Sequence, residues 1–158
     1  MLDKYEKTRV ALYRALFPEN FSTDVSCYLK PDEELANAEE LAPVLHPTFE
    51  ASDGGIQRRP PDIVVNKATG QFDPNTGGTS VFDRAGVLKR SMGDFVIPDG
   101  TDIPPDISVV EDSYNQRLKA THYTIMPSKS LYRDALMGKL DNLVRNAIRR
   151  QWEKARGL

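Results

Sequence analysis

The chain has 158 residues, with 21 Lys and Arg, 23 Asp and Glu, and a formal net charge of -2. This length suits one domain whose core needs no covalent or metal cross-link. The composition, 39% hydrophobic and 28% charged, is typical of a globular protein in water. The slightly acidic balance disfavours a dedicated nucleic-acid binder. Cys27 is the only cysteine, so an intramolecular disulfide is excluded.

We expect Cys27 to be a buried structural thiol in a protein made in the reducing cytoplasm. The N-terminal stretch MLDKYEKTRVALYRALF carries charges throughout, unlike a signal peptide. No run of about 20 apolar residues predicts a membrane span. We therefore expect no membrane partner, and any export would proceed without a cleaved signal.

Charge is distributed unevenly along the sequence. Acidic residues dominate between Asp24 and Asp53, whereas the tail from Arg145 to Arg156 is basic. Either surface could bind a charged partner.

The first third predicts one strand and one helix. Residues 8–17 alternate in polarity like a strand, with Leu12 and Arg14 on one face, although a short helix is also open. Residues 30–47 predict a helix, because Asp32 can cap it and apolar residues recur at helical spacing up to Pro43.

Turn residues separate short strand candidates between residues 47 and 105. A single helix is then expected after Pro127, because apolar residues recur every three or four positions. The expected order is therefore α+β. The strand candidates are residues 62–66, 79–83, 95–98, 107–111 and 120–127, and the helical stripe is Tyr132, Leu136, Leu140, Leu143, Ala147 and Ile148.

The stretch NTGGTSVFDRAG, residues 75–86, places two small hydroxyls after two glycines. Gly77 and Gly78 permit either a tight turn or the close approach of a ligand. Thr79 and Ser80 then begin a strand. The residues alone leave both interpretations open.

Two histidines are the candidates for acid–base work near neutral pH. We interpret His46, beside Pro47, as structural. Strand alternation puts His122 and Thr124 on one face, with Tyr123 and Ile125 on the other. A structural and a functional role for His122 both stay open.

Several kinds of site lack their residues. Two distant histidines and one cysteine give no recognised metal-ligand spacing, so we expect no metal. Phosphate-loop, dinucleotide-binding and GxSxG motifs are absent from the sequence. The basic tail with Trp152 predicts a solvated helix face, and a ribonuclease using His122 stays open.

Three segments together resemble one family: LYRA at 12–15, GGTSVFDRAG at 77–86 and THYTIMP at 121–127. With the DFVIPDGTDIPPD loop, the KPDEELA segment and the DNLVRNAIRRQWEKARGL ending, the whole chain resembles small type VI secretion effector toxins. The resemblance implies a single ADP-ribosyltransferase-like domain over residues 1–158. That fold is a split β-sheet flanked by helices, with NAD bound in a cleft.

The resemblance also implies a biological setting and a site. Such a toxin is exported by the type VI machinery, arrests growth from the recipient's cytoplasm, and is neutralised by an immunity protein that covers the cleft. Thr79, Ser80 and His122 match the family's catalytic residues, and Arg14, Gly78, Thr79 and Ser80 its NAD-binding residues. Small hydroxyls can approach the nicotinamide ribose, and an arginine can pair with the pyrophosphate.

One position departs from the pattern. Most transferases of this fold carry a glutamate on a late strand, where this chain has His122; Glu111 and Asp112 precede that strand. Transfer of ADP-ribose and hydrolysis of NAD therefore both stay open. A ribonuclease toxin and a non-catalytic toxin that blocks a host component are the alternatives.

Overall fold

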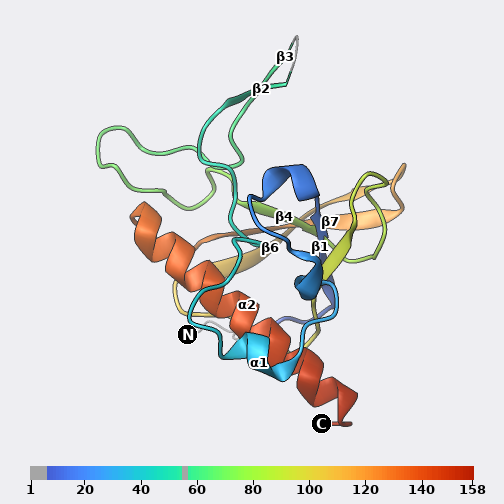
Figure 1. Ribbon diagram of the computed structural model, residues 1–158. Helices are drawn as coiled ribbons and strands as arrows, with labels where there is room; N and C mark the ends of the chain where they lie inside the picture. Colours follow the sequence, from blue (N-terminus) through green and yellow to red (C-terminus); the bar gives the residue numbers. More distant parts are fainter. Residues whose placement is uncertain (1–6, 55–56) are drawn as a thin grey trace.

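A five-stranded antiparallel sheet with one long helix packed across it forms the body of the molecule (Figure 1). This computed structural model describes residues 7–54 and 57–158. Residues 1–6, the start of the stretch considered for a signal peptide, and residues 55–56, in the turn-rich region between residues 47 and 105, lie outside the described residues. The α+β class expected from the sequence is confirmed.

The sheet has the order β5-β1-β4-β7-β6, so the first strand of the chain lies inside it between β5 and β4. A separate hairpin, β2–β3, projects from this body (Figure 1). The elements are β1 (Leu12–Leu16), η1 (Pro18–Asn20), η2 (Ser26–Tyr28), α1 (Glu33–Ala36), β2 (Ser52–Gly54), β3 (Gln57–Arg59), β4 (Thr79–Phe82), β5 (Gly93–Ile97), β6 (Ile107–Asn115), β7 (Ala120–Pro127) and α2 (Arg133–Ala155).

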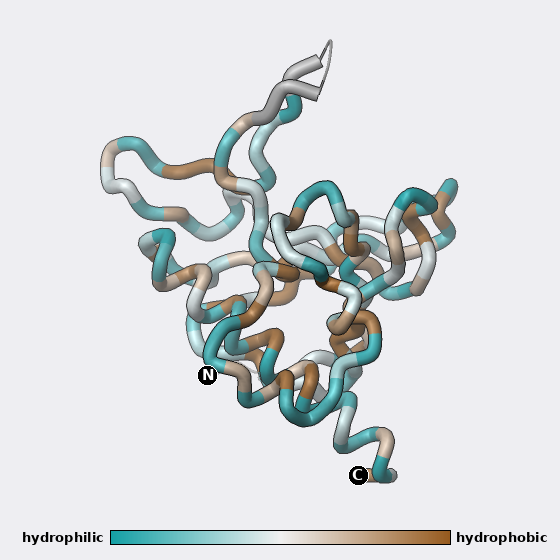
Figure 2. The backbone as a smooth tube through the Cα atoms, viewed as in Figure 1, coloured by the Kyte–Doolittle hydropathy of each residue, from teal (hydrophilic) through white to brown (hydrophobic). Residues whose placement is uncertain are grey.

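Helix α2 buries its apolar stripe against one face of the sheet, here called the core face. Apolar residues gather there in the middle of the molecule, as Figure 2 shows. Burying each large aliphatic side chain contributes roughly 1.5–3 kcal/mol. The core face and the helix meet through Leu12, Leu16, Val81, Phe95, Ile97 and Ile125 of the sheet and Leu136, Leu140, Leu143, Val144, Ala147 and Ile148 of α2.

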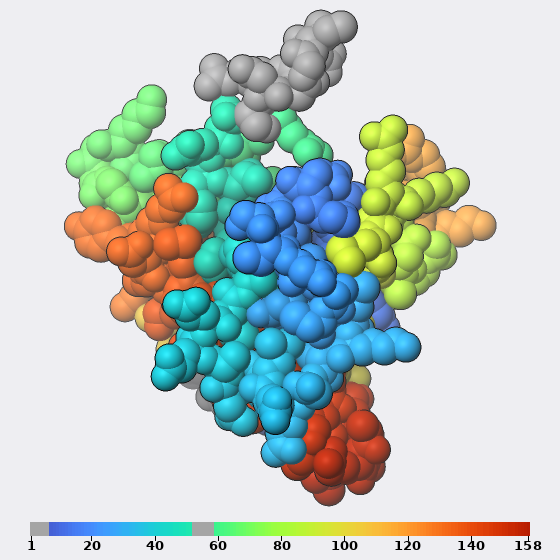
Figure 3. All heavy atoms as spheres, viewed as in Figure 1, coloured from blue at the N-terminus to red at the C-terminus, as the bar shows by residue number. Residues whose placement is uncertain are grey.

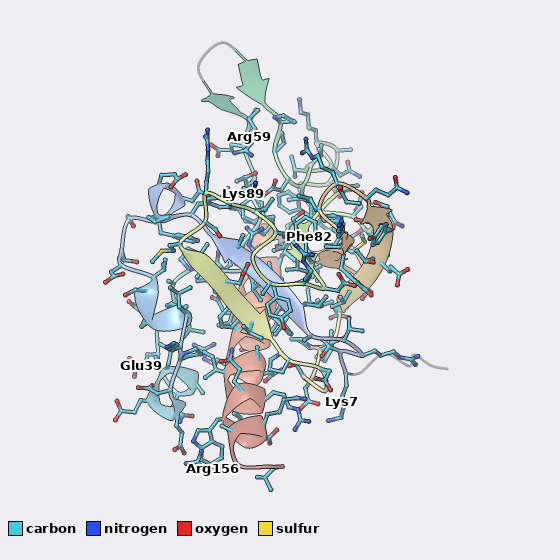
Figure 4. The ribbon with its side chains drawn as sticks, turned by 90° about the vertical axis from the view of Figure 1, so that its right-hand side faces the viewer. Lys7, Glu39, Arg59, Phe82, Lys89 and Arg156 are labelled. Carbon is cyan, nitrogen blue, oxygen red and sulfur yellow. The ribbon has the colours of Figure 1, made fainter. Side chains whose placement is uncertain are left out.

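The opposite face of the sheet, here called the open face, has a smaller apolar cluster. Phe82, Val87 and Ala120 pack together there, with Leu88 and Leu118 at the margin. Figure 4 shows Phe82 and Lys89 on the same side of the molecule, far from Arg156 at the end of α2. The β4–β5 loop and the β6–β7 turn thus cover only part of the open face.

Most strands and the terminal helix were predicted correctly. The strand at 120–127 is confirmed with its bounds, and β1, β4, β5 and β6 confirm four of the other five candidates with shifted ends. The terminal helix is also confirmed, but Tyr132 is wrongly placed in its buried stripe. Tyr132 precedes the first helical turn and is 61% exposed.

The helix predicted over residues 30–47 is wrong beyond its first turn. Asp32 caps α1 as expected, its carboxylate accepting from the Leu35 amide, but α1 ends at Ala36. After α1 the backbone carbonyls form hydrogen bonds outside the helix, because those of Ala38 and Glu39 accept from the Arg145 guanidinium. Val44 and Leu45 then enter the core. Tertiary contacts therefore override the helical pattern.

Two further expectations are wrong, and one element was missed. Residues 62–66 form no strand; Ile63 and Asn66 make only isolated bridges, to Gly77 and Gln71. The β2–β3 hairpin was not predicted. Cys27 is exposed rather than buried, because η2 turns Tyr28 toward the core instead.

Candidate functional site

The two hydroxyls that follow the glycines lie on opposite faces of the sheet, because successive side chains of a strand alternate. Thr79 is fully buried on the core face, where its Oγ1 donates to the Leu45 carbonyl at 2.5 Å. Ser80 is exposed on the open face. The structure therefore separates the pair that the sequence places side by side.

Ser80 and His122 meet on the open face through a hydrogen bond between Oγ and Nε2. The register explains this contact. Ser80 pairs with Thr124 and Phe82 with His122 across β4 and β7, so all four side chains share the face. The Phe82 ring meets the imidazole edge to face, with 5.2 Å between the ring centroids. The predicted sharing of one face by His122 and Thr124 is confirmed.

Asp112 completes this cluster, and the sequence did not assign it a role. The β6–β7 register shifts between Glu111 and Ser113, so Asp112 is the extra residue of a β-bulge. Bulges re-aim side chains in this way. The Asp112 Oδ2 lies 2.8 Å from His122 Nδ1 and also accepts from the Thr124 hydroxyl. A bulge has no reliable sequence signal, which is why this carboxylate was missed.

The three groups form a directed chain of hydrogen bonds. A carboxylate only accepts, so His122 Nδ1 must carry the proton that it shares with Asp112. In the neutral imidazole, Nε2 is then an acceptor and the Ser80 hydroxyl donates to it. An imidazole held by a carboxylate and accepting from a hydroxyl is the arrangement of a general base beside an activated nucleophile. His122 is about one quarter exposed and Asp112 about two fifths, so solutes can reach both.

The glycines before β4 allow close packing of backbone. A Cβ added to Gly77, whose φ is +116°, would lie 2.0 Å from the Asp62 carbonyl oxygen. One added to Gly78 would lie 2.2 Å from that of Ile125. Both are far inside contact distance. The space beside Gly78 is therefore occupied by β7, which explains this glycine without a bound nucleotide.

Arg14 lies on the core face, on the opposite side of the sheet from the Ser80 and His122 side chains. It shares that face with Leu12 and Leu16, as expected from alternation. Its guanidinium donates to three backbone carbonyls, those of Val44, Ser80 and His46, at 3.2, 3.0 and 3.5 Å. Burial lowers the pKa of Arg14, and the charge of Asp62 opposes that shift. Arg14 thus ties β1 to β4 and to residues 44–46.

His46 also contacts a distant element. Its Nε2 lies 2.8 Å from Asp141 Oδ1 on α2. This pair and the Arg14 contacts fasten the segment between β1 and β2, which spreads over the front of the molecule in Figure 3. The structure gives His46 a joining contact, in keeping with its structural interpretation.

Neither of two cavities in the described residues includes the Ser80–His122 cluster. One of about 250 Å³ lies between the segment near Lys7 and α2, and one of about 210 Å³ lies between α1 and α2. Ser80 is exposed on the open face, and the His122 side chain beside it is about one quarter exposed. Residues 7–54 and 57–158 contain no group of three or more metal-ligating side chains. They also contain no helix long and apolar enough to cross a bilayer.

The fold and this cluster define the class of protein: a small α+β enzyme domain with a carboxylate, an imidazole and a hydroxyl in line on one sheet face. Residues 6–152 match the family model described as Tse2 ADP-ribosyltransferase toxin. The chain is also 66% identical over 155 residues to a protein named Toxin Tse2 from Pseudomonas aeruginosa, covering 98% of both chains. The chain belongs to the Tse2 ADP-ribosyltransferase toxin family. It is an ADP-ribosyltransferase-like toxin, as the sequence resemblance implied.

Proposed function

We propose that this toxin uses NAD as its substrate and breaks the bond between nicotinamide and ribose at the open face. The observation that carries the proposal is the hydrogen bond between exposed Ser80 and His122, on a chain of the ADP-ribosyltransferase toxin family. In this proposal Ser80 and His122 are the catalytic residues. Thr79, Gly78 and Arg14 act by holding β4 in place and not by touching NAD.

The reaction explains why such groups are needed. Loss of nicotinamide leaves positive charge on the ribose, as in glycoside hydrolysis. Preorganised polar groups that face the developing charge lower the barrier by several kcal/mol. The Asp112 carboxylate supplies negative charge at this surface, the Ser80 oxygen supplies lone pairs, and His122 can take up a proton.

Nicotinamide release tests the proposal directly. The purified chain should release nicotinamide from NAD, and His122→Ala should lower the rate at least about 100-fold. His46→Ala is the matched control, since His46 also pairs with an aspartate but lies on the core side. It should keep the rate of the folded protein, with folding checked by circular dichroism. Intact NAD with cleaved RNA would instead favour a ribonuclease, and intact NAD with unchanged toxicity of His122→Ala a non-catalytic toxin.

We propose further that the chain is an antibacterial effector exported through the type VI machinery and active in the recipient's cytoplasm. Family membership as a toxin supports this setting. Expression of the chain inside a sensitive bacterium should arrest growth, whereas expression of His122→Ala should not. Growth arrest by both forms would show that the proposed reaction does not cause the toxicity.

The cell that makes this toxin in its cytoplasm requires protection from it. We propose an immunity protein that binds the toxin and covers the open face around Ser80. The partner would exclude substrate simply by occupying this exposed surface. Nicotinamide release should stop when the partner is added in equal amount. If NAD is still cleaved in the complex, the partner binds elsewhere.

A further inference from the structure

We propose that an exposed basic patch beside the catalytic cluster docks RNA, and that RNA is the acceptor of the ADP-ribose that the toxin takes from NAD. The patch lies on the β4–β5 loop, residues 83–92, and the β6–β7 turn, residues 116–119. The acceptor step rests on the proposed use of NAD, whereas the docking of RNA can be measured without NAD. The cations of the basic patch are Arg84, Lys89, Arg90, Arg117 and Lys119.

The cations of the basic patch have no partner within the chain. All five are exposed, and within residues 7–54 and 57–158 none of their side chains forms an ion pair, a hydrogen bond or a ring contact. The basic tail that the sequence singled out differs, because each of its cations has a partner. These pairs are Arg133 with Glu50, Lys139 with Asp106, Arg145 with the Ala38 carbonyl, Arg149 with Asn146, Arg150 with Glu153, Lys154 with Asp99 and Arg156 with the Trp152 ring.

The carboxylates near the basic patch bond to groups other than its cations. Asp83, the one acidic residue of the two segments, accepts from the Thr121 amide at 2.8 Å. Asp94, at the start of β5, accepts from the Gly86 amide at 2.9 Å. The patch is therefore strongly positive on a chain whose net charge is -2. Net charge averages over all surfaces and does not reveal this one.

Apolar contacts hold the two segments of the patch together next to the catalytic cluster. Val87 of the loop and Ala120 after the turn pack with Phe82. The Phe82 ring in turn contacts the His122 imidazole. The loop and the turn lie side by side at one edge of the molecule (Figures 1 and 3). A polyanion bound along the patch therefore reaches the open face beside His122.

The chemistry of the patch fits the phosphates of RNA better than the carboxylates of a protein. Three of its cations are arginines, whose planar guanidinium matches a phosphate with paired donors. Apart from Met92 at the end of the loop, the exposed residues of both segments are charged, amide or small, so they offer little apolar anchor to a protein. The pyrophosphate of NAD would engage only part of this charge. RNA also carries at each nucleotide a 2′-hydroxyl nucleophile that DNA lacks.

The transfer step needs no reactant besides NAD and RNA. A hydroxyl oxygen of the RNA forms a bond to C1″ of the nicotinamide ribose while the bond from C1″ to the nicotinamide nitrogen breaks. The electron pair of that bond leaves with nicotinamide, which becomes neutral. The hydroxyl proton passes to solvent, and the RNA keeps the ADP-ribose.

Binding of poly(U) to the full chain, followed by fluorescence anisotropy over a range of salt concentrations, tests the docking. Two double variants remove charge from each segment in turn: Lys89→Gln with Arg90→Gln, and Arg117→Gln with Lys119→Gln. Each should weaken binding at least about 10-fold. Each should also reduce the magnitude of the slope of log affinity against log salt by about 1.4, because two phosphate contacts are lost.

Arg149→Gln with Arg156→Gln is the matched control, because it removes the same charge from exposed residues of the basic tail. Figure 4 shows Arg156 far from Lys89. This variant should keep the affinity and the salt slope, and circular dichroism checks the folding of all variants. Failure of poly(U) to bind at low salt, full binding by both patch variants, or tighter binding of poly(dT) or polyglutamate overturns the docking of RNA.

NAD labelled on its adenine, added with the full chain to a bacterial lysate, tests the acceptor. Label should appear in material that ribonuclease digests and protease does not. Both patch variants should lose this labelling and keep nicotinamide release from NAD alone, because Ser80 and His122 are unchanged.

The outcomes separate this inference from the proposed NAD reaction. Label on protein or DNA with none on RNA overturns RNA as the acceptor and leaves the NAD reaction intact. Loss of nicotinamide release by the patch variants in the absence of RNA shows that the patch binds NAD, and it also overturns the inference. Absence of nicotinamide release by the unsubstituted chain overturns the NAD reaction and the transfer step, while poly(U) binding still decides the docking.

Discussion

Thr79 and Ser80 show how one peptide unit divides two roles between the faces of a strand. Thr79 holds the core side of β4 to Leu45, and Ser80 contacts His122 on the open side. The sequence indicated the residue types but gave both hydroxyls the same task. The alternation of side chains along β4 gives them different contacts in the structure, Thr79 with the Leu45 carbonyl and Ser80 with His122.

Substitutions of Thr79 and Ser80 should affect different properties, the first stability and the second activity. Thr79→Val keeps the shape of the side chain and leaves the buried Leu45 carbonyl without its donor. The free energy of unfolding should fall by about 1–3 kcal/mol. Ser80→Ala, at an exposed position, should change it by less than about 0.5 kcal/mol. Urea unfolding measures both. Nicotinamide release should survive in Thr79→Val at temperatures where it is folded and be lost in Ser80→Ala; the reverse pattern would place the chemistry on Thr79.

Asp112 acts by holding the His122 ring in one tautomer, so its substitution should change the protonation pattern of the imidazole as well as the rate. Asp112→Asn removes the carboxylate charge that fixes the proton on Nδ1. We expect kcat to fall about 100-fold with little change in KM, and ¹⁵N NMR of the ring should show a mixture of tautomers. Glu111→Gln, one position earlier and bonded to Tyr123 instead, is the control. An unchanged tautomer in Asp112→Asn would contradict this role.

At the scale of elements, most strands and the terminal helix were predictable from local patterns, whereas the segment after Asp32 was not. The periodicity of α2 and the alternation of β7 extend over many residues, and each agrees with its burial. The segment after Asp32 carries a helical pattern as well, yet α1 stops at Ala36 because Arg145 takes the following carbonyls. That competition comes from a residue more than 100 positions away, which no local pattern contains.

Two glycines differ in whether a distant strand occupies the space beside them. Gly78→Ala would bring a Cβ to 2.2 Å from the Ile125 carbonyl, whereas one added to Gly138 meets nothing within 4 Å. We expect Gly78→Ala to destabilise the protein by about 1–3 kcal/mol, because β4 and β7 must separate. Gly138→Ala, inside α2, should stabilise it by up to about 1 kcal/mol. Thermal unfolding of both variants checks this. Tolerance of Gly78→Ala would mean that the space is kept for something other than β7.

At the scale of the whole molecule, the two faces of the sheet carry different kinds of contact. The core face carries α2, Arg14 and residues 44–46, which join distant parts of the chain. The open face carries Ser80, His122 and Asp112. The sequence placed Arg14 with the site because both match one family pattern; in the structure its guanidinium lies on the core face and donates to the Ser80 carbonyl. Asp112 could not be predicted, since its aim depends on a register shift between two strands.

Tyr28 offers a test of how the segment between β1 and β2 is held to this body. Its ring packs edge-on against Phe95 of β5, and its hydroxyl oxygen accepts from the Ala42 amide at 2.6 Å. Burial raises the pKa of Tyr28 above its ordinary value of 10.0. A raised pKa in the folded state means that the stabilisation is fully present below pH 10.0 and is lost as the pH rises through the folded value.

Tyr28→Phe should therefore cost about 1 kcal/mol at neutral pH, where the Ala42 amide loses its acceptor. The difference in the free energy of unfolding between the two proteins should narrow above the ordinary tyrosine pKa. In that pH range the unfolded state of the unsubstituted protein gains stability by ionising Tyr28, whereas a phenylalanine at that position cannot ionise. Urea unfolding at about pH 8 and about pH 11 measures the gap. Tyr114→Phe is the control, since Tyr114 is 60% exposed and its substitution should leave the pH profile unchanged. A gap that stays constant with pH would show that Tyr28 is not held in a buried, neutral state by the folded chain.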